Sequence, residues 1–174
     1  MKKELGVHPY LFPMPVLMIA TYGDDNVVDV MNMAWGGICA ENMVSLNIDE
    51  DHKTSENIKK RGAFTLSIAD IPHIEAADFF GIASGNKMPD KFERSGLSAV
   101  KSEKVDAPIV QEFPLTLETV GYVVQILAVE GRCYHAPARE VVDIERTRLL
   151  HYHVGIVLIR WQAIRLLPCC RTGR

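Results

Sequence analysis

The sequence lacks the features that mark several large classes of protein. Its four cysteines, Cys39, Cys133, Cys169 and Cys170, form no Cys-x-x-Cys pair, which argues against both a zinc site and a disulfide framework. The formal net charge is only −3. No strongly basic face is indicated, so we do not expect nucleic acid as a partner.

Long apolar runs are also missing. The stretch Val16–Ala20 is far too short to span a bilayer. Met1-Lys2-Lys3 resembles the basic start of a signal peptide, but Pro9, Pro13 and Pro15 interrupt the apolar segment that such a peptide needs. We therefore expect a cytoplasmic protein with no membrane partner.

What is present suits an ordinary globular chain. Hydrophobic residues make up 48% and charged residues 24% of 174 residues, which is enough for a single domain over residues 1–174 with a real core. We find no internal repeat and no low-complexity tract.

Periodicity and turn residues predict a mainly β fold. An irregular segment over residues 1–15 precedes a hairpin, and glycines stop both expected helices. The expected strands are Val16–Tyr22, Val27–Met33, Met43–Ile48, Ala63–Ala69 and Leu115–Val120, and the expected helices begin at Thr54, as N-cap, and span Ile74–Phe80. Short strands with inserted helices predict a closed, mainly antiparallel β-barrel with peripheral helices.

The segment from His52 to Asn57 could bind a phosphate. A helix N-terminus offers free backbone N–H groups and a favourable dipole, Thr54 and Ser55 add hydroxyl donors, and Lys53 or His52 adds positive charge. A plain capped helix followed by a solvated basic turn explains the same residues.

The segment Met31–Ile38 could line a planar ring. Asn32 can both donate and accept, Gly36 and Gly37 let the backbone approach closely, and Trp35 offers an aromatic surface. The alternative is a strand end in which Trp35 fills core volume.

The segment Gly81–Phe92 could wrap a polar ligand, because it combines glycines with a serine, two lysines and an aspartate. A surface loop with solvated charges, Ser84–Phe92, is the alternative.

Two further groups of residues give little support for a functional site. His151 and His153 lack a third metal ligand nearby, and Cys169-Cys170 is an incidental or modestly redox-sensitive pair. We expect no metal, and no catalytic acid, base or nucleophile stands out.

These segments, in this order, resemble the flavin reductase-like, flavoredoxin-type branch of the FMN-binding split-barrel superfamily. The stretches that match are YLFPMPVLMIATYG, DVMNMAWGGI, HKTSENIKKRGAFTLSIAD, EAADFFGIASGNKMPDKFERSGL and VKSEKVDAPIVQEFPLTLE, which lie between Tyr10 and Glu118. The resemblance implies a homodimeric FMN-binding split β-barrel with FMN near the subunit interface.

Carried over to this sequence, the resemblance implies three groups of FMN-binding residues. Those expected to line the isoalloxazine are Asn32, Met33, Ala34 and Trp35. Those expected at the phosphate end are His52, Lys53, Thr54, Ser55 and Asn57. Those expected to close over the flavin are Ser84, Gly85, Lys87, Asp90, Lys91 and Phe92.

Residue usage changes in the last third of the chain, 119–174. All nine lysines lie between Lys2 and Lys104, whereas eight of the ten arginines lie from Arg132 onward. The strand-like runs Val120–Val129 and Val154–Trp161 remain, but the family's usual ending is not legible there. Two explanations stay open: chance divergence, or a frameshifted or otherwise non-ancestral segment.

The resemblance implies an NAD(P)H-dependent flavin reductase, or a flavoredoxin-like electron carrier that serves a redox partner protein. NADH or NADPH would deliver hydride to the flavin N5, although the sequence has no GxGxxG dinucleotide motif. The alternatives are a flavin-binding or electron-transfer module with no turnover of its own, and a chain whose altered tail impairs FMN binding.

Overall fold

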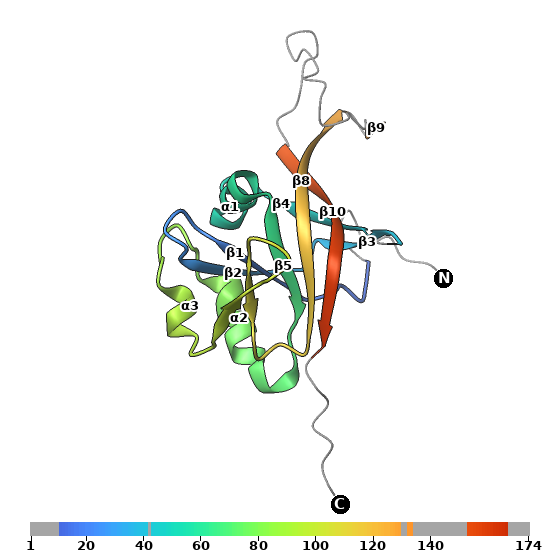
Figure 1. Cartoon of the computed structure of the whole chain (residues 1–174). Helices are drawn as coiled ribbons and strands as arrows, with labels where there is room; N and C mark the ends of the chain where they lie inside the picture. The colour runs from blue at the N-terminus through green and yellow to red at the C-terminus, as the bar shows by residue number, and fades with distance from the viewer. Residues whose placement is uncertain (1–10, 42, 130–131, 134–152, 167–174) are drawn as a thin grey trace, which may run out of the picture.

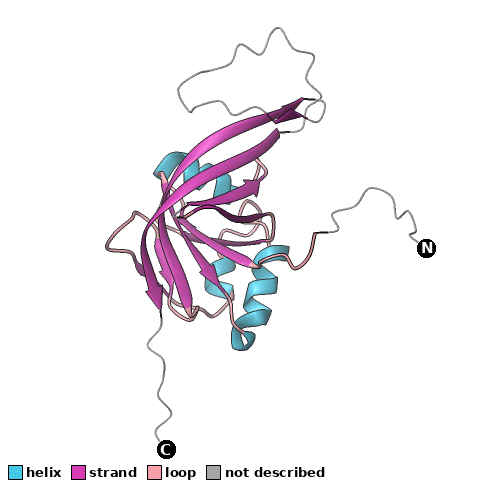
Figure 2. Ribbon diagram, turned by 90° about the vertical axis from the view of Figure 1, so that its right-hand side faces the viewer, coloured by secondary structure: helices cyan, strands magenta, loops and turns pink. Residues whose placement is uncertain are grey.

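The chain folds into mainly β structure with helices at its periphery (Figures 1 and 2). The structure, a computed structural model, describes residues 11–41, 43–129, 132–133 and 153–166. The strands are β1 (Leu17–Tyr22), β2 (Val28–Met33), β3 (Gly36–Ala40), β4 (Met43–Ile48), β5 (Ala63–Ile68), β6 (Ala99–Lys101), β7 (Pro108–Val110), β8 (Leu115–Val129), β9 (Arg132–Cys133) and β10 (His153–Leu166). The helices are α1 (Lys53–Arg61), the 3₁₀ turn η1 (Ile71–His73), α2 (Ile74–Ile82) and α3 (Lys91–Arg94).

One antiparallel sheet forms the body of the molecule. Its strand order is β2-β1-β5-β8-β10-β4-β3, with β9 paired to β8 beside this path, and β6 and β7 form a separate two-stranded sheet. The strands at the two ends of the path, β2 and β3, are joined by Ala34 and Trp35 alone. The curved sheet therefore returns on itself and leaves a seam between β2 and β3, where no ladder joins them within the described residues. The prediction of a mainly β barrel with peripheral helices is confirmed.

Strand β1 is buried on both faces, which agrees with the apolar run Leu17–Ala20 at its start. Leu17 and Ile19 face one core cluster, which α1 joins through Ile58. Met18 and Ala20 face a second cluster on the other side of the strand. That second cluster also holds Ala77 and Phe80 of α2 and Phe92 of α3. The helices α2 and α3 therefore cover the outer face of β1 and β2.

Several predicted boundaries were wrong. Strand β3 forms although Gly36 and Gly37 have little β propensity, because β4 supplies a paired edge. Helix α1 begins at Lys53 with His52 as its N-cap, so Thr54 is not the cap. Gly62, at φ 65°, ends that helix as expected, whereas α2 continues through Gly81. The loop predicted over Ser84–Phe92 ends early, because α3 begins at Lys91.

The last third of the chain contributes strands to the main sheet. Strand β8 runs from Leu115 to Val129 without a break, and β10 pairs with both β8 and β4. The strand-like runs predicted at Val120–Val129 and Val154–Trp161 therefore lie in β8 and β10. His151, Cys169 and Cys170 lie outside the described residues. In the described part of the chain, no helix has the length and apolar character needed to cross a bilayer.

Candidate functional site

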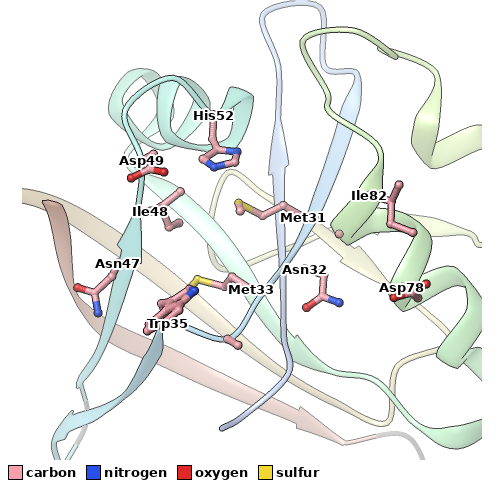
Figure 3. A pocket seen from close by; sticks show the side chains of 12 residues that line it. Met31, Asn32, Met33, Trp35, Asn47, Ile48, Asp49, His52, Asp78 and Ile82 are labelled. Atoms are coloured by element: carbon pink, nitrogen blue, oxygen red, sulfur yellow. The ribbon is translucent and has the colours of Figure 1, made fainter. Parts of the chain in front are cut away.

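A cleft lies where the barrel is open between β2 and β3 (Figure 3). Its volume is about 840 Å³, within the range of about 300–1,000 Å³ typical of ligand pockets. The end of β2 and its link to β3 form one wall, β4 and the start of α1 form a second, and α2 forms a third. The lining residues are Met31, Asn32, Met33, Ala34, Trp35, Asn47, Ile48, Asp49, His52, Asp78, Gly81 and Ile82.

The β2–β3 link presents an aromatic side chain to this cleft. Trp35 is 56% exposed, so it does not fill core volume. Its carbonyl accepts a hydrogen bond from the Asn47 N–H at 2.8 Å, which ties the link to β4. Asn32 is held by its Nδ2, which donates to the Ala77 carbonyl of α2 at 3.0 Å. The four residues predicted to line a ring, Asn32–Trp35, therefore share one cleft.

Asn47 lies on the β4 wall of this cleft and carries an unsatisfied acceptor, although Figure 3 shows its amide directed away from Trp35 and His52. Its Oδ1 is buried and has no hydrogen-bond partner within the described part of the chain. A buried amide oxygen without a partner costs free energy, and the large majority of such atoms in proteins are paired.

Around the beginning of α1, the N-cap residue faces the cleft, whereas the polar side chains that follow it point into the interior. His52 lines the cleft, whereas Thr54 Oγ1 donates to Asp29 Oδ2 at 2.7 Å and Ser55 Oγ donates to the Asp49 carbonyl at 2.7 Å. Asn57 Nδ2 donates to Thr21 Oγ1 at 3.0 Å. These three residues are at least nine-tenths buried, so their side chains fasten the helix to the barrel.

Lys53, the first residue of α1, is partly exposed and pairs with Glu56 at 3.0 Å. Hydrogen bonds from Lys60 and Lys53 lower the pKa of the Glu56 carboxyl. The first N–H groups of an α-helix have no partner within the helix. The beginning of α1 therefore offers backbone donors next to His52 at the cleft, and the Lys53 ammonium on the side of a second, smaller cavity.

Asp29 of β2, which sequence reasoning missed, joins three elements. It accepts the Thr54 hydroxyl of α1 and forms an ion pair with Lys91 of α3, Nζ to Oδ1 at 2.8 Å. Gly85 lies so close that a Cβ there would overlap Asp29 Oδ1. An aspartate in the apolar strand VDVMNM was the available signal, since buried carboxylates need partners.

The predicted loop residues do not line the cleft together. Lys91 is buried against Asp29, and Phe92 stacks on Phe80 in the second core cluster, with ring centroids 6.1 Å apart. Asp90 accepts a hydrogen bond from Arg94 at 2.7 Å. The exposed Ser84 and Lys87 lie in the same loop, but neither lines the cleft. Gly85 lines a second, smaller cavity together with Lys53 and Asn57.

The acidic residues of the cleft are Asp49 and Asp78, and His52 lies beside them. Asp49, Asp51 and His52 each place one ligand atom within 4.8 Å of the others, and all three are exposed. Exposed acidic groups of this kind are common without an ion. A negatively charged ligand group would therefore meet its positive partners at the beginning of α1, from Lys53 and the backbone N–H groups.

Comparison with known proteins identifies the family. The model of the flavin reductase-like domain matches residues 10–145. The chain belongs to the flavin reductase-like domain family. This match continues beyond Glu118, where sequence inspection had placed the departure from the family.

Solved structures of similar proteins share this fold. Flavoredoxin of Desulfovibrio vulgaris (Miyazaki F) matches with a TM-score of 0.76 and 28% identity, over 98% of this chain and 79% of that one. Flavoredoxin from Methanosarcina acetivorans matches with a TM-score of 0.68 and 18% identity, over 95% and 76%. An uncharacterized protein of Pyrococcus abyssi (strain GE5 / Orsay) is 30% identical over 115 residues, and the matched region spans 64% of each chain. This member of the flavin reductase-like family thus has a flavin-related function.

Proposed function

We propose that this chain binds FMN non-covalently in the cleft between β2 and β3. We propose that it acts as an NAD(P)H-dependent flavin reductase or as a flavoredoxin-like electron carrier. The observation that carries this proposal is the meeting of Trp35 and His52 in one cleft. Residues from two distant segments, predicted to hold opposite ends of one cofactor, thus line the same cleft.

The residues of the cleft fit the ring of FMN. Isoalloxazine is a planar ring with apolar faces, and its pyrimidine edge carries an N–H between two carbonyls. The cleft offers the aromatic Trp35 and the apolar Met31 and Met33 as walls. Asn32 also lines the cleft, and we propose that its amide meets this polar edge.

The phosphate end of FMN fits the beginning of α1. The first backbone N–H groups, the Lys53 ammonium and the His52 imidazole can meet a dianion there. Thr54, Ser55 and Asn57 stay predicted phosphate ligands, but their side-chain donors already serve Asp29, Asp49 and Thr21. We propose that Thr54 and Ser55 contribute through their backbone N–H groups.

When bound, FMN supplies the hydride and electron transfer that side chains do not provide. The residues of this chain would bind the FMN, orient its ring and exclude water from it. Trp35 and Asn32 line the cleft on the β2 side, and the Asn32 amide is fixed by the Ala77 carbonyl of α2. These residues would hold the ring in one position while leaving part of it open to a reductant, for which we propose NADH or NADPH.

We also propose a homodimer, because large apolar side chains are exposed at the cleft and beside it. Trp35 is 56% exposed, and Ile38 of β3 and Ile82 of α2 are each 78% exposed. Exposed apolar patches commonly mark interaction surfaces. Light scattering should give the mass of two chains, and a monomeric FMN-loaded protein would contradict this part of the proposal.

The test is an absorbance titration of the purified full chain with FMN, followed by NADH and NADPH under anaerobic conditions. We expect a saturable shift of the flavin bands, followed by bleaching with at least one nicotinamide. A saturable shift without bleaching would favour the alternative of an electron-transfer module without turnover of its own. Colourless, monomeric protein that gives no shift would favour the remaining alternative, a chain whose tail, residues 119–174, impairs FMN binding.

A further inference from the structure

The outer side of α2 is apolar, although this helix lies at the periphery of the molecule (Figures 1 and 2). On its inner side, Ala77 and Phe80 pack into the second core cluster. On its outer side, Ile71 of η1 and Ile74 and Ile82 of α2 are 85%, 62% and 78% exposed. A helix that is apolar on both sides is typical of a helix that is covered. The exposed isoleucines therefore indicate a surface that another molecule contacts.

These isoleucines form a stripe that reaches the cleft between β2 and β3. Ile71, Ile74, Asp78 and Ile82 follow one another at intervals of three or four residues, which places them on one side of η1 and α2. We call these four residues the α2 stripe. Asp78 and Ile82 also line the cleft (Figure 3). A molecule seated on the α2 stripe would therefore lie beside the opening in which we propose that the flavin ring binds.

The charges along the α2 stripe are negative. Glu75 and Asp78 are exposed and form no ion pair in the part of the chain that the structure describes. His73 of η1 is paired with Asp70, and the sequence from β5 through α2 contains no lysine or arginine. Lys87 lies in the loop after α2, at the opposite end of the helix from Glu75. An apolar surface with acidic neighbours is complementary to a partner with basic residues around an apolar patch.

We propose that the α2 stripe is the docking surface for a basic redox protein that takes electrons from the bound flavin. This inference rests on the proposed function, because the flavin is the source of the electrons. A protein cannot enter a cleft of about 840 Å³, so it has to approach the ring from outside, at the rim that Ile82 and Asp78 form. Basic side chains of the partner meet Glu75 and Asp78, and apolar contacts cover Ile71 and Ile74. Small, electrostatically steered interfaces of this kind are typical of transient electron-transfer complexes.

The probe for this surface is ferric cytochrome c, a small basic haem protein. Acetylated cytochrome c, which keeps the haem but loses the lysine charges, is the matched probe. In the electron-transfer reaction, two ferric haems each accept one electron from one reduced FMN. The products are two ferrous haems, one oxidised FMN and two protons released to the buffer.

Two variants of the full chain change the docking surface, and a third is the control. Glu75→Lys reverses a charge, and Ile74→Ser removes an apolar side chain; neither residue lines either cavity. The control Glu103→Lys reverses an exposed charge in the turn between β6 and β7. Surface plasmon resonance measures binding to the chain without FMN. Stopped-flow absorbance measures electron transfer from the FMN-loaded chain after reduction with dithionite and removal of the excess.

We expect saturable binding of cytochrome c that weakens as salt is added, and little binding of the acetylated form. Glu75→Lys should lower both the association rate and the second-order rate of electron transfer about tenfold at low ionic strength. Ile74→Ser should raise the dissociation constant several-fold through the lost apolar contact. Glu103→Lys should keep both quantities close to their wild-type values.

Absence of saturable binding, equal binding of the two cytochrome forms, or equal effects of Glu75→Lys and Glu103→Lys would overturn the proposal. Light scattering that shows a dimeric wild type and a monomeric Ile74→Ser variant would also overturn it, because a second copy of the chain would then cover the α2 stripe. A chain that takes up no FMN would refute the proposed function, and with it the electron transfer. The binding measurement needs no flavin and decides the docking surface separately.

Discussion

Lys91 Nζ lies 2.8 Å from Asp29 Oδ1, and the two side chains are only 3% and 8% exposed. The pair joins the short helix α3 to strand β2. Thr54 of α1 donates to the other oxygen of the same carboxylate. Asp29 therefore fixes the beginning of α1, where we propose that phosphate binds, relative to the loop that follows α2.

Removing one partner of this buried pair should be costly, because a buried charge without its counter-ion is strongly destabilising. Lys91→Met should lower the free energy of unfolding in urea by about 3–5 kcal/mol. The double variant Asp29→Asn/Lys91→Met should lose less than the sum of the two single variants. Lys59→Met, at an exposed position of α1, is the control and should change little. Equal effects of Lys91→Met and Lys59→Met would disprove this role.

Gly85 should tolerate no side chain. An added Cβ would overlap Asp29 Oδ1 and stand 3.1 Å from Lys53 Cβ, and Asp29 cannot move without leaving Lys91. Gly85→Ala should therefore destabilise the fold by about 1–3 kcal/mol, as expected for overpacking. Gly37→Ala, whose Cβ meets no atom within 4 Å, is the matched control. A Gly85→Ala protein as stable as Gly37→Ala would show that this loop lies elsewhere.

The strands that sequence reasoning found are those whose own residues carry the pattern. Val44, Leu46 and Ile48 alternate with half-buried residues along β4, so periodicity predicted that strand. Strand β3 was missed because Gly36 and Gly37 contribute no such pattern, and pairing with Leu46 and Ser45 of β4 decides their conformation. A tertiary contact of this kind leaves no local signal.

The candidate site was predicted in part for the same reason. The segment Met31–Ile38 was visible from its asparagine, tryptophan and glycines, and the structure places Asn32–Trp35 in the cleft. Asn47 was missed because it occupies the polar face of an ordinary alternating strand, and only the missing hydrogen bond distinguishes it. Phe92 looked like a ligand residue by its loop position, but it packs in the core because α3 begins one residue before it.

Trp35 should control the emission of bound flavin. A tryptophan beside the ring quenches flavin fluorescence, so Trp35→Ala should raise the emission of bound FMN at saturation. Ile38→Ala removes another exposed apolar side chain of the same region and should leave the spectrum unchanged. Steady-state and time-resolved fluorescence provide the measurement. Identical spectra for the wild type and Trp35→Ala would exclude Trp35 as a neighbour of the ring.

Lys60 should make stability depend on acid pH. It donates to Asp24 and Glu56 and lowers the pKa of both carboxyls from 3.8 and 4.5. The resulting stabilisation is complete above these values and is lost as the pH falls through the lowered values of the folded state. Lys60→Met should therefore flatten the fall in unfolding free energy below pH 4.5.

The control for this pH dependence is Lys104→Met at an exposed position, which should keep the wild-type curve. High salt should reduce the difference between the wild type and Lys60→Met, because the groups are exposed and screened. The measurement is urea unfolding across the acid range. Parallel curves for the wild type and Lys60→Met would refute the assignment.

Lys53→Ala should weaken FMN binding if the beginning of α1 holds the phosphate. A hydrogen bond to a charged group contributes about 1.5–3 kcal/mol, so the dissociation constant should rise about tenfold or more. Lys59→Ala on the same helix is the matched control, because Lys59 pairs with Glu50 at 3.5 Å and lines neither cavity. Riboflavin, which lacks the phosphate, should bind both variants equally. If Lys53→Ala and Lys59→Ala bound FMN with the same affinity, the phosphate would have to lie away from α1.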